Sequence, residues 1–350
     1  SQHIKKLFYK DFFTKEEYEF GDNSLNEDRD YKGYYNLQAL LTFKKTFGKH
    51  TIDALAGYQQ ENEESNGVSA ARTGYPTDLV WVLDAGPKDN WSNEGNAAHW
   101  AISSMIGRLN YDFAGKYILS ASIRSDASSR FAKGNRWSAF PSFAAAWRIS
   151  QESFVKNSGH AIDDLKIRVS WGETGASAGL GLYPSYTTIS MDGIVLNSTW
   201  MQTAKLNTIG NEDLGWERTE MFDVGVDLRT VNGRLGVSGD YYVKRTKDIL
   251  IGLPVPLEYG FGEPNVNIGK MGNHGWEIEV KWNDQRKGFK YEVSANLSNN
   301  TNEVLDLGGT GPWKTTGYTD IGLPFQSLYG YEASGLFQSN DEVENAPFQN

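Results

Sequence analysis

The chain has 350 residues, of which 13% are aromatic, 37 are Gly and only 10 are Pro; this composition disfavours disorder, because aromatic side chains bury enough surface to offset chain entropy. The net charge of -10, without any cluster of Lys and Arg, argues against a nucleic-acid partner, since phosphate binding depends on basic surfaces. The absence of Cys excludes disulfides, thiolate catalysis and cysteine-ligated metal sites.

The sequence contains no run of about 18 apolar residues, so a membrane-spanning helix is excluded. Strands of a membrane β-barrel are polar on one face and are not excluded by the same criterion. The chain starts at Ser1 without a signal peptide and stops at Asn350 among polar residues. We therefore expect both ends to be cuts in a longer chain.

Alternation of apolar and polar residues with period two is the strongest pattern in the sequence and places every second side chain on one face of a sheet. It predicts about ten strands. In chain order these lie within 34–46, 52–58, 105–113, 117–124, 143–149, 165–171, 222–228, 235–243, 276–282 and 289–297.

The connections between these strands alternate between short and long. Short turns containing Gly are predicted near 47, 115, 232 and 286, with a longer connection at 150–163 on the same side. Long polar loops are predicted at about 1–30, 65–98, 176–214, 251–271 and 303–350. Outer-membrane barrels keep short turns on the periplasmic side and long loops outside, whereas soluble sandwiches distribute long loops over both ends.

Aromatic residues flank the short turns in the apolar register, as in the aromatic girdle of a membrane interface. The alternative is that they fill a soluble β-core. We favour an all-β fold in which residues 1–350 form part of one antiparallel transmembrane β-barrel. The flanking aromatics are Phe43, Phe47, Tyr111, Phe113, Tyr117, Trp147, Trp282, Phe289 and Tyr291.

Several longer stretches go beyond pattern and resemble, in the same order, the SusC/RagA family of TonB-dependent outer-membrane transporters of Bacteroidetes. The resemblance covers most of the chain and is weakest in residues 1–30 and in the long loops. It is carried by residues 107–125 (GRLNYDFAGKYILSASIRS), 130–150 (RFAKGNRWSAFPSFAAAWRIS), 165–175 (LKIRVSWGETG), 211–216 (NEDLGW), 273–277 (NHGWE) and 327–338 (SLYGYEASGLFQ).

The resemblance implies a 22-stranded barrel in the bacterial outer membrane, closed by a plug domain and covered by a SusD-like lipoprotein lid. It implies import of oligosaccharides or peptides driven by the TonB complex, which acts through an N-terminal region missing from this chain. About ten strands of such a barrel are present in this sequence, without the plug. An open sheet of lipid-facing strands would leave unpaired edges, so we expect the remaining strands to be supplied elsewhere.

We expect no catalytic residue, cofactor or metal site, and hence no enzyme. The five His residues lack metal-ligand spacing, and the acidic pairs Glu63-Glu64 and Asp163-Asp164 point to opposite faces of a strand. Four Asn sequons are interpreted as chance matches in a bacterial protein. Lumen-facing polar residues such as Ser120, Arg124 and Asp126 are equally compatible with a transport path and with an ordinary water-facing wall.

Aromatic residues in the long loops are the best candidates for substrate binding, because sugar rings stack on Trp and Tyr and exposed aromatics are otherwise costly. Packing within the loops or against a lid is the alternative role for them. The candidates are Trp81, Trp91, Tyr183, Tyr186, Trp200 and Trp313.

Two other functions remain open at this stage. A secreted all-β carbohydrate-binding protein would have hydrophilic outer faces on its sheets. A TonB-dependent importer of siderophores or vitamins would share the barrel but lack the lid lipoprotein.

Overall fold

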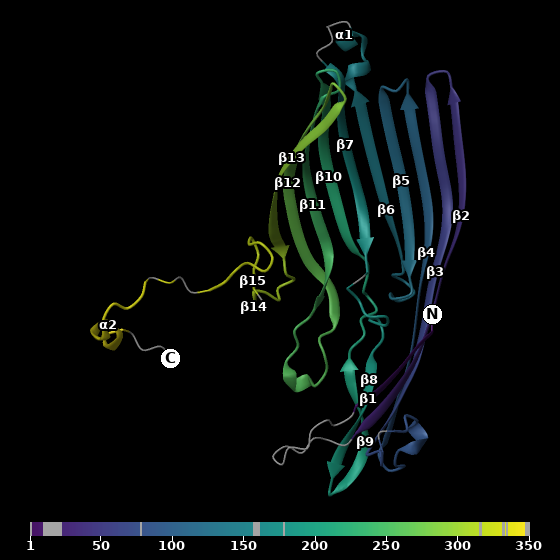
Figure 1. Cartoon of the computed structure of the whole chain (residues 1–350), viewed down its shortest axis with the longest axis vertical. Coiled ribbons are helices and arrows are strands. Elements are labelled where there is room, and N and C mark those ends of the chain that lie inside the picture. Colours follow the sequence, from purple (N-terminus) through teal and green to yellow (C-terminus); the bar gives the residue numbers. More distant parts are fainter. Residues whose placement is uncertain are drawn as a thin grey trace.

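The computed structural model describes residues 2–9 (backbone only), 23–77, 79–156, 162–177, 179–314, 317–330, 333 and 335–346. Its main feature is a long, curved, antiparallel sheet of eleven strands (Figure 1). In spatial order these are β1 (Gln2–Tyr9), β2 (Ser24–Phe47), β3 (His50–Thr73), β4 (Trp91–Phe113), β5 (Tyr117–Ser128), β6 (Trp137–Arg148), β7 (Ile162–Ala176), β10 (Glu217–Thr230), β11 (Leu235–Gly252), β12 (Asn265–Arg286) and β13 (Phe289–Asp306).

Each of these strands pairs with its neighbour in the chain, except that β7 pairs with β10. The exception arises because β8 (Thr188–Leu196) and β9 (Thr199–Thr208) form a separate hairpin between them. The remaining elements are short. They are η1 (Leu83–Ala85), η2 (Ile149–Gln151), α1 (Ser153–Lys156), η3 (Leu257–Tyr259), β14 (Trp313–Lys314), β15 (Tyr318–Thr319) and α2 (Asn340–Glu344).

The short turns lie together at one end of the sheet, the upper end in Figure 1, where α1 also lies. The predicted turns near 47, 115, 232 and 286 and the longer connection after β6 are confirmed. Each tight turn places a glycine at positive φ, which a residue without Cβ adopts at no steric cost; these are Gly48, Gly115, Gly233 and Gly288.

The two faces of the sheet differ along every central strand, because residues paired across an antiparallel ladder lie on the same face. Val280 pairs with Val237 on β11 and Ala295 on β13, and these three define part of an apolar face. One residue earlier, Glu279 pairs with Ser238 and Asn296 on the polar face. The predicted register of β12 is therefore confirmed by its neighbours.

The apolar face is continuous over the sheet and open to the surroundings of the chain. A single cross-strand row runs through Ala121, Phe143, Trp171 and Phe222 on β5, β6, β7 and β10. Phe143 and Phe222 are 56% and 44% exposed, whereas aromatic side chains in the core of a water-soluble protein are buried. This exposed apolar face argues against the soluble β-core considered from the sequence.

Several predicted loop boundaries are wrong, because strands continue into polar sequence. Residues 2–9 and 24–30 are paired strands rather than part of a loop. Strand β3 runs to Thr73 and β4 starts at Trp91, which reduces the 65–98 loop to a connection of residues 74–90. Residues 61–69 of β3 are almost all polar on both faces, so the period-two signal that marks a half-buried strand is lost there.

The other three loop ranges also contain regular structure. The β8 and β9 hairpin occupies the middle of 176–214, β12 begins inside 251–271, and β14, β15 and α2 lie within 303–350. Among the residues that the structure describes, no helix is both long enough and apolar enough to cross a membrane.

Candidate functional site

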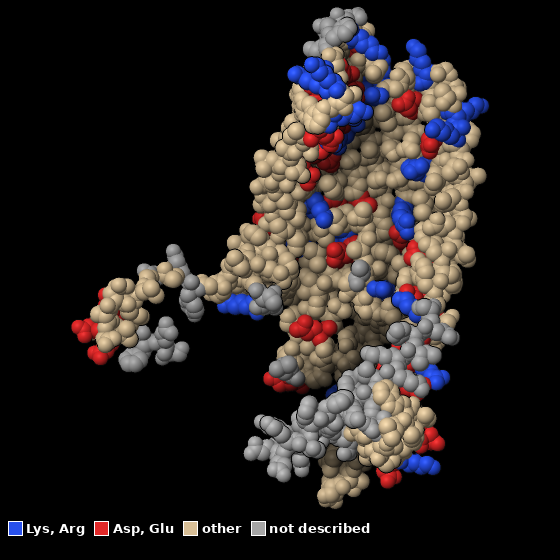
Figure 2. Space-filling view, viewed as in Figure 1, with Lys and Arg blue, Asp and Glu red and all other residues tan. Residues whose placement is uncertain are grey.

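The polar face of the sheet is concave and carries most of the charged side chains of the central strands. Figure 2 looks onto this face, where Lys, Arg, Asp and Glu gather along the trough formed by β2 to β13. The same parity that sends Val280 to the apolar face sends Glu277 and Lys281 here. We call this surface the polar wall.

One charged group on the polar wall is centred on Arg168 of β7. Its Nε donates to Asp227 Oδ2 at 3.0 Å, and its Nη2 donates to Asp240 Oδ2 at 2.9 Å. The Nη1 atom lies 2.8 Å from Asp240 Oδ1 and 3.9 Å from Asp223 Oδ1. Three acidic side chains therefore surround one guanidinium, which indicates a structural tie between β7, β10 and β11.

Gly225 lies at the centre of this network, paired with both Arg168 and Asp240. A Cβ atom at this position would meet the Asp240 carboxylate and the Arg168 guanidinium. A larger residue here would displace the Arg168 and Asp240 side chains from their present positions.

A second charged group lies on β4 and β5. Arg124 Nε donates to both carboxylate oxygens of Asp126, at 2.8 and 2.9 Å, and its Nη2 donates to Ser104 Oγ at 2.9 Å. The Arg124 side chain is 43% exposed, whereas that of Asp126 is 12% exposed. The Arg124 guanidinium is thus accessible from the trough, whereas the negatively charged Asp126 carboxylate is largely covered.

Next to this pair the polar wall contains a hollow of about 990 Å³. Arg130 places its guanidinium 6.0 Å from the centre of the Trp100 ring, within cation–π range. Arg130 Nη1 also donates to the carbonyls of Ser177 and Leu180, at 3.2 and 2.8 Å. The hollow combines these donors with aromatic surface; its lining includes Trp100, Arg124, Arg130, Phe140, Ser142 and Trp216.

This combination can bind large polar molecules. Aromatic faces stack on sugar rings or apolar side chains, and guanidinium N–H groups donate to hydroxyl, carbonyl or carboxylate oxygens. Neither Trp100 nor Arg130 was selected from the sequence. Trp100 lies on β4, just after the predicted 65–98 loop, and Arg130 lies in the connection after β5, so only the fold brings the two side chains together.

A small buried core supports the hollow at the end where the long connections lie. Phe131 and Leu214 are fully buried, and Trp216 donates its Nε1–H to the Arg136 carbonyl at 2.8 Å. Asn135 Nδ2 donates to the Glu212 carbonyl at 2.9 Å. The motifs at 130–150 and 211–216 thus pack against each other.

The six loop aromatics are not brought into one pocket, and none of them lines the hollow. Tyr183 is nearest to it by contact, since its hydroxyl accepts from the His99 N–H at 3.0 Å, next to Trp100. Trp313 donates its Nε1–H to the Thr310 carbonyl at 3.1 Å within its own loop. Trp81, Trp91, Tyr186 and Trp200 are all more than half exposed.

The titratable residues considered for catalysis have structural contacts. Asp163 Oδ2 accepts from the Gly233 N–H at 2.7 Å, and Asp164 Oδ1 accepts from Ser150 Oγ at 2.6 Å, both at the short-turn end. Glu63 lies 2.9 Å from Lys32 Nζ. Over the part of the chain that the structure describes, no group of His, Asp and Glu side chains is arranged to hold a metal ion.

Comparison with known proteins extends these observations. Residues 3–345 match the family described as TonB dependent receptor-like, beta-barrel. The chain is 35% identical over 322 residues to TonB-dependent receptor P39 of Formosa agariphila, covering 90% of this chain and 30% of that protein. It is 30% identical over 303 residues to TonB-dependent receptor SusC of Bacteroides thetaiotaomicron, covering 83% of this chain and 29% of that protein.

A solved structure shares the fold over most of the chain. The RagAB peptide transporter superposes with a TM-score of 0.76 at 27% identity, over 87% of this chain and 34% of that one. The chain therefore spans about a third of the length of the relatives it matches.

Proposed function

The chain belongs to the TonB dependent receptor-like β-barrel family, and from this membership we propose that it forms one wall of an outer-membrane transporter that imports oligosaccharides or peptides. TonB would supply the energy, and a SusD-like lipoprotein would cover the long-connection end. The observation that carries the proposal is the two-faced sheet: a continuous apolar face suits lipid, and a charged trough suits a water-filled passage.

The alternatives have less support. A secreted carbohydrate-binding protein would have to expose the apolar face to water, which soluble proteins avoid. Import of a siderophore or vitamin would use the same barrel, but the similarity to a peptide transporter favours larger cargo.

We propose that cargo meets the sheet in two places. The six candidate aromatics, all of them exposed except Trp313, would make the first, shape-tolerant contacts; these are Trp81, Trp91, Tyr183, Tyr186, Trp200 and Trp313. The hollow around Trp100 and Arg124 would then bind cargo oxygens inside the trough.

The test uses the complete transporter with its lid partner, purified from cells grown on a glycan and peptide mixture. Mass spectrometry of the co-purified molecules should identify an oligosaccharide or a peptide. Uptake of that molecule should stop in cells without TonB, whereas its binding should persist. Recovery of a siderophore, or uptake that is independent of TonB, would contradict the proposal.

The hollow is tested by calorimetry with the recovered cargo. Trp100→Ala should weaken binding up to about tenfold, because one aromatic contact contributes roughly 0.5 to 1.5 kcal/mol. Trp276→Ala on the apolar face of β12 is the matched control and should bind normally. If Trp200→Ala weakens binding and Trp100→Ala does not, the loop aromatics and not the hollow select the cargo.

A further inference from the structure

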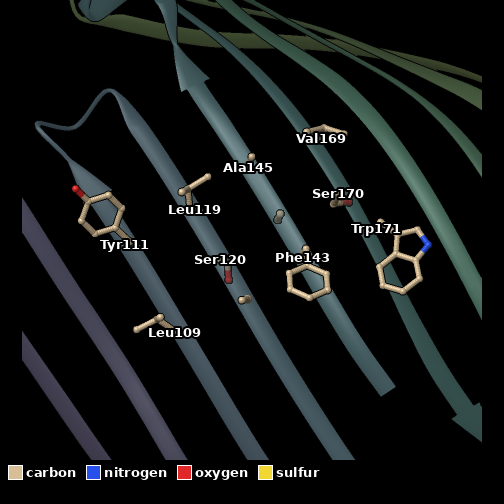
Figure 3. A pocket seen from close by; sticks show the side chains of 11 residues that line it. Leu109, Tyr111, Leu119, Ser120, Phe143, Ala145, Val169, Ser170 and Trp171 are labelled. Atoms are coloured by element: carbon tan, nitrogen blue, oxygen red, sulfur yellow. The ribbon is translucent and has the colours of Figure 1, made fainter. Parts of the chain in front are cut away.

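The apolar face contains a groove of about 570 Å³ across β4 to β7. Figure 3 shows the short side chain of Ala145 between Leu119 and Val169, with the rings of Tyr111, Phe143 and Trp171 along the same groove. The groove arises from the register, because Ala121 is paired between Leu109 and Phe143, and Ala145 between Leu119 and Val169. Small side chains on β5 and β6 form the floor, and larger ones on both sides form the walls.

The groove ends close to the short-turn end of the sheet. Ala145 lies three residues before the end of β6, a rise of about 10 Å along a strand. Between groove and turns, the rings of Tyr117 and Trp147 are stacked with centroids 6.5 Å apart. Glu152 accepts hydrogen bonds from both rings, at 2.8 and 3.3 Å, so apolar surface changes to polar surface there.

The turns above the groove form a connected basic rim. Ala114 N donates to the Lys49 carbonyl at 2.6 Å, and Arg148 N donates to the Lys116 carbonyl at 2.8 Å. Lys116 and Arg148 are paired with Glu152 and Asp164, respectively. These backbone contacts place the three hairpin ends side by side.

Several lysines of this region have no ion-pair partner among the described residues; one of them lies on the apolar face of β2 and another in the β2–β3 turn. Lys45 and Lys49 are exposed, and no carboxylate among the described residues lies within 4.0 Å of either ammonium. Lys45 pairs with Ile52, which pairs with Tyr111 of the groove, so Lys45 shares the apolar face at about 10 Å from Tyr111. A lysine in this position extends its ammonium toward the headgroup level of a bilayer.

We propose that the groove binds an acyl chain of an anionic phospholipid from the membrane leaflet at the short-turn end, and that Lys45 and Lys49 bind its phosphate. This inference rests on the membrane placement given under Proposed function. The apolar walls of the groove exclude water from the acyl chain, and the small alanine side chains of its floor make the groove deep enough to hold it. The two ammonium groups are opposite in charge to the phosphate of the headgroup.

The experiment measures lipid retention by the complete transporter in detergent, using native mass spectrometry with added palmitoyl-oleoyl phosphatidylglycerol or phosphatidylcholine. The unmodified protein should retain phosphatidylglycerol in preference to phosphatidylcholine. Lys45→Gln and Lys49→Gln should each weaken retention about fivefold, the contribution of one Lys near an anionic lipid surface. Ala145→Phe, which fills the groove, should abolish specific retention.

Matched controls lie on the same surfaces outside the groove. Ala295→Phe changes an alanine of the apolar face on β13, and Lys287→Gln changes an exposed lysine of the β12–β13 turn. Both should retain phosphatidylglycerol normally. Heat-modifiable migration on gels establishes that each variant is folded before lipid is measured.

Three results would overturn the proposal: unchanged retention in Ala145→Phe, equal loss in the Ala295→Phe control, or a change of oligomeric state in Ala145→Phe with lipid unaffected, which would assign the groove to a second copy. Cargo binding is measured on the same samples. Loss of lipid selectivity with normal cargo binding rejects only the lipid site, whereas absence of cargo binding in the unmodified protein rejects the proposed function.

Discussion

At the residue scale, the Arg168 guanidinium is the most connected charge on the polar wall. Arg168→Met should destabilise the folded transporter by about 1.5 to 3 kcal/mol, because Asp227 and Asp240 lose a charge-assisted donor while remaining close together. Denaturant unfolding in lipid vesicles measures the change. Lys205→Gln, which breaks an exposed pair with Asp192, is the control and should cost less than about 1 kcal/mol. Equal effects would show that the Arg168 network contributes no more than a surface ion pair.

Glu152 provides a pH-dependent contact outside the sheet. Hydrogen bonds from Lys116, Tyr117 and Trp147, with Lys116 the largest cause, lower the pKa of its carboxyl to about 2. A lowered folded-state pKa stabilises the protein above the unfolded pKa, and this contribution is lost as pH falls from about 4.5 toward 2. The thermal unfolding midpoint of Glu152→Gln should therefore lie below that of the unmodified protein at pH 5, and the difference should shrink as the pH is lowered to 2.

Glu258→Gln serves as the control for this titration, because Glu258 is an exposed acid in η3 that forms no ion pair with any of the described residues. Its midpoint should follow that of the unmodified protein at every pH. A difference for Glu152→Gln that stays constant between pH 5 and 2 would mean that the carboxylate charge does not stabilise the connection after β6.

Sequence and structure agree at the residue scale where a local rule applies. Period-two parity correctly assigns Arg124 and Asp126 to the polar wall, since the assignment needs only their position in a strand. The contact between Arg130 and Trp100 could not be predicted in this way. It joins Trp100 on β4 to Arg130 in the connection after β5, and depends on how these two segments come together in three dimensions.

At the scale of elements, the assignment of faces on β12 gives a direct prediction. Val280 pairs with Val237 and Ala295, so Val280→Arg should cost about 2 to 4 kcal/mol near the bilayer midplane. Glu279→Gln on the opposite face should be nearly neutral. Folding of the complete barrel into vesicles measures both. Similar losses for the two variants would mean that the lipid-facing side has been assigned wrongly.

The strands and short turns were predictable, whereas the ends of the strands were not. Alternation marks β12 because one face meets apolar and the other polar surroundings. In β3, residues 61–69 pair with β2 and β4 while both faces stay polar, so no periodic signal distinguishes them from a loop. Pairing of β1 with β2 was missed for the related reason that its partner segment, residues 24–31, lacks clear alternation.

At the scale of the whole molecule, the short turns and the long connections should face opposite compartments. Because this chain contains no Cys, single substitutions provide unique labelling sites within it. In intact cells, a membrane-impermeant maleimide should react with Thr199→Cys in the β8–β9 hairpin and not with Lys49→Cys in the β2–β3 turn. Lys49→Cys should become reactive once the outer membrane is permeabilised. The reverse pattern in intact cells would invert the proposed topology.

The order of strands in the sheet has a consequence for how the protein reaches this structure. Nearly every strand pairs with the one that precedes it in the chain, so each of these ladders can form as soon as its two strands are present. Among the eleven strands, only β7 and β10 pair across a segment, residues 177–216, that contains two strands of another sheet. The entropic cost of closing a loop grows slowly with its length, so the long connection between β7 and β10 adds little to the free energy of forming this ladder. The hairpins on either side of it can form independently.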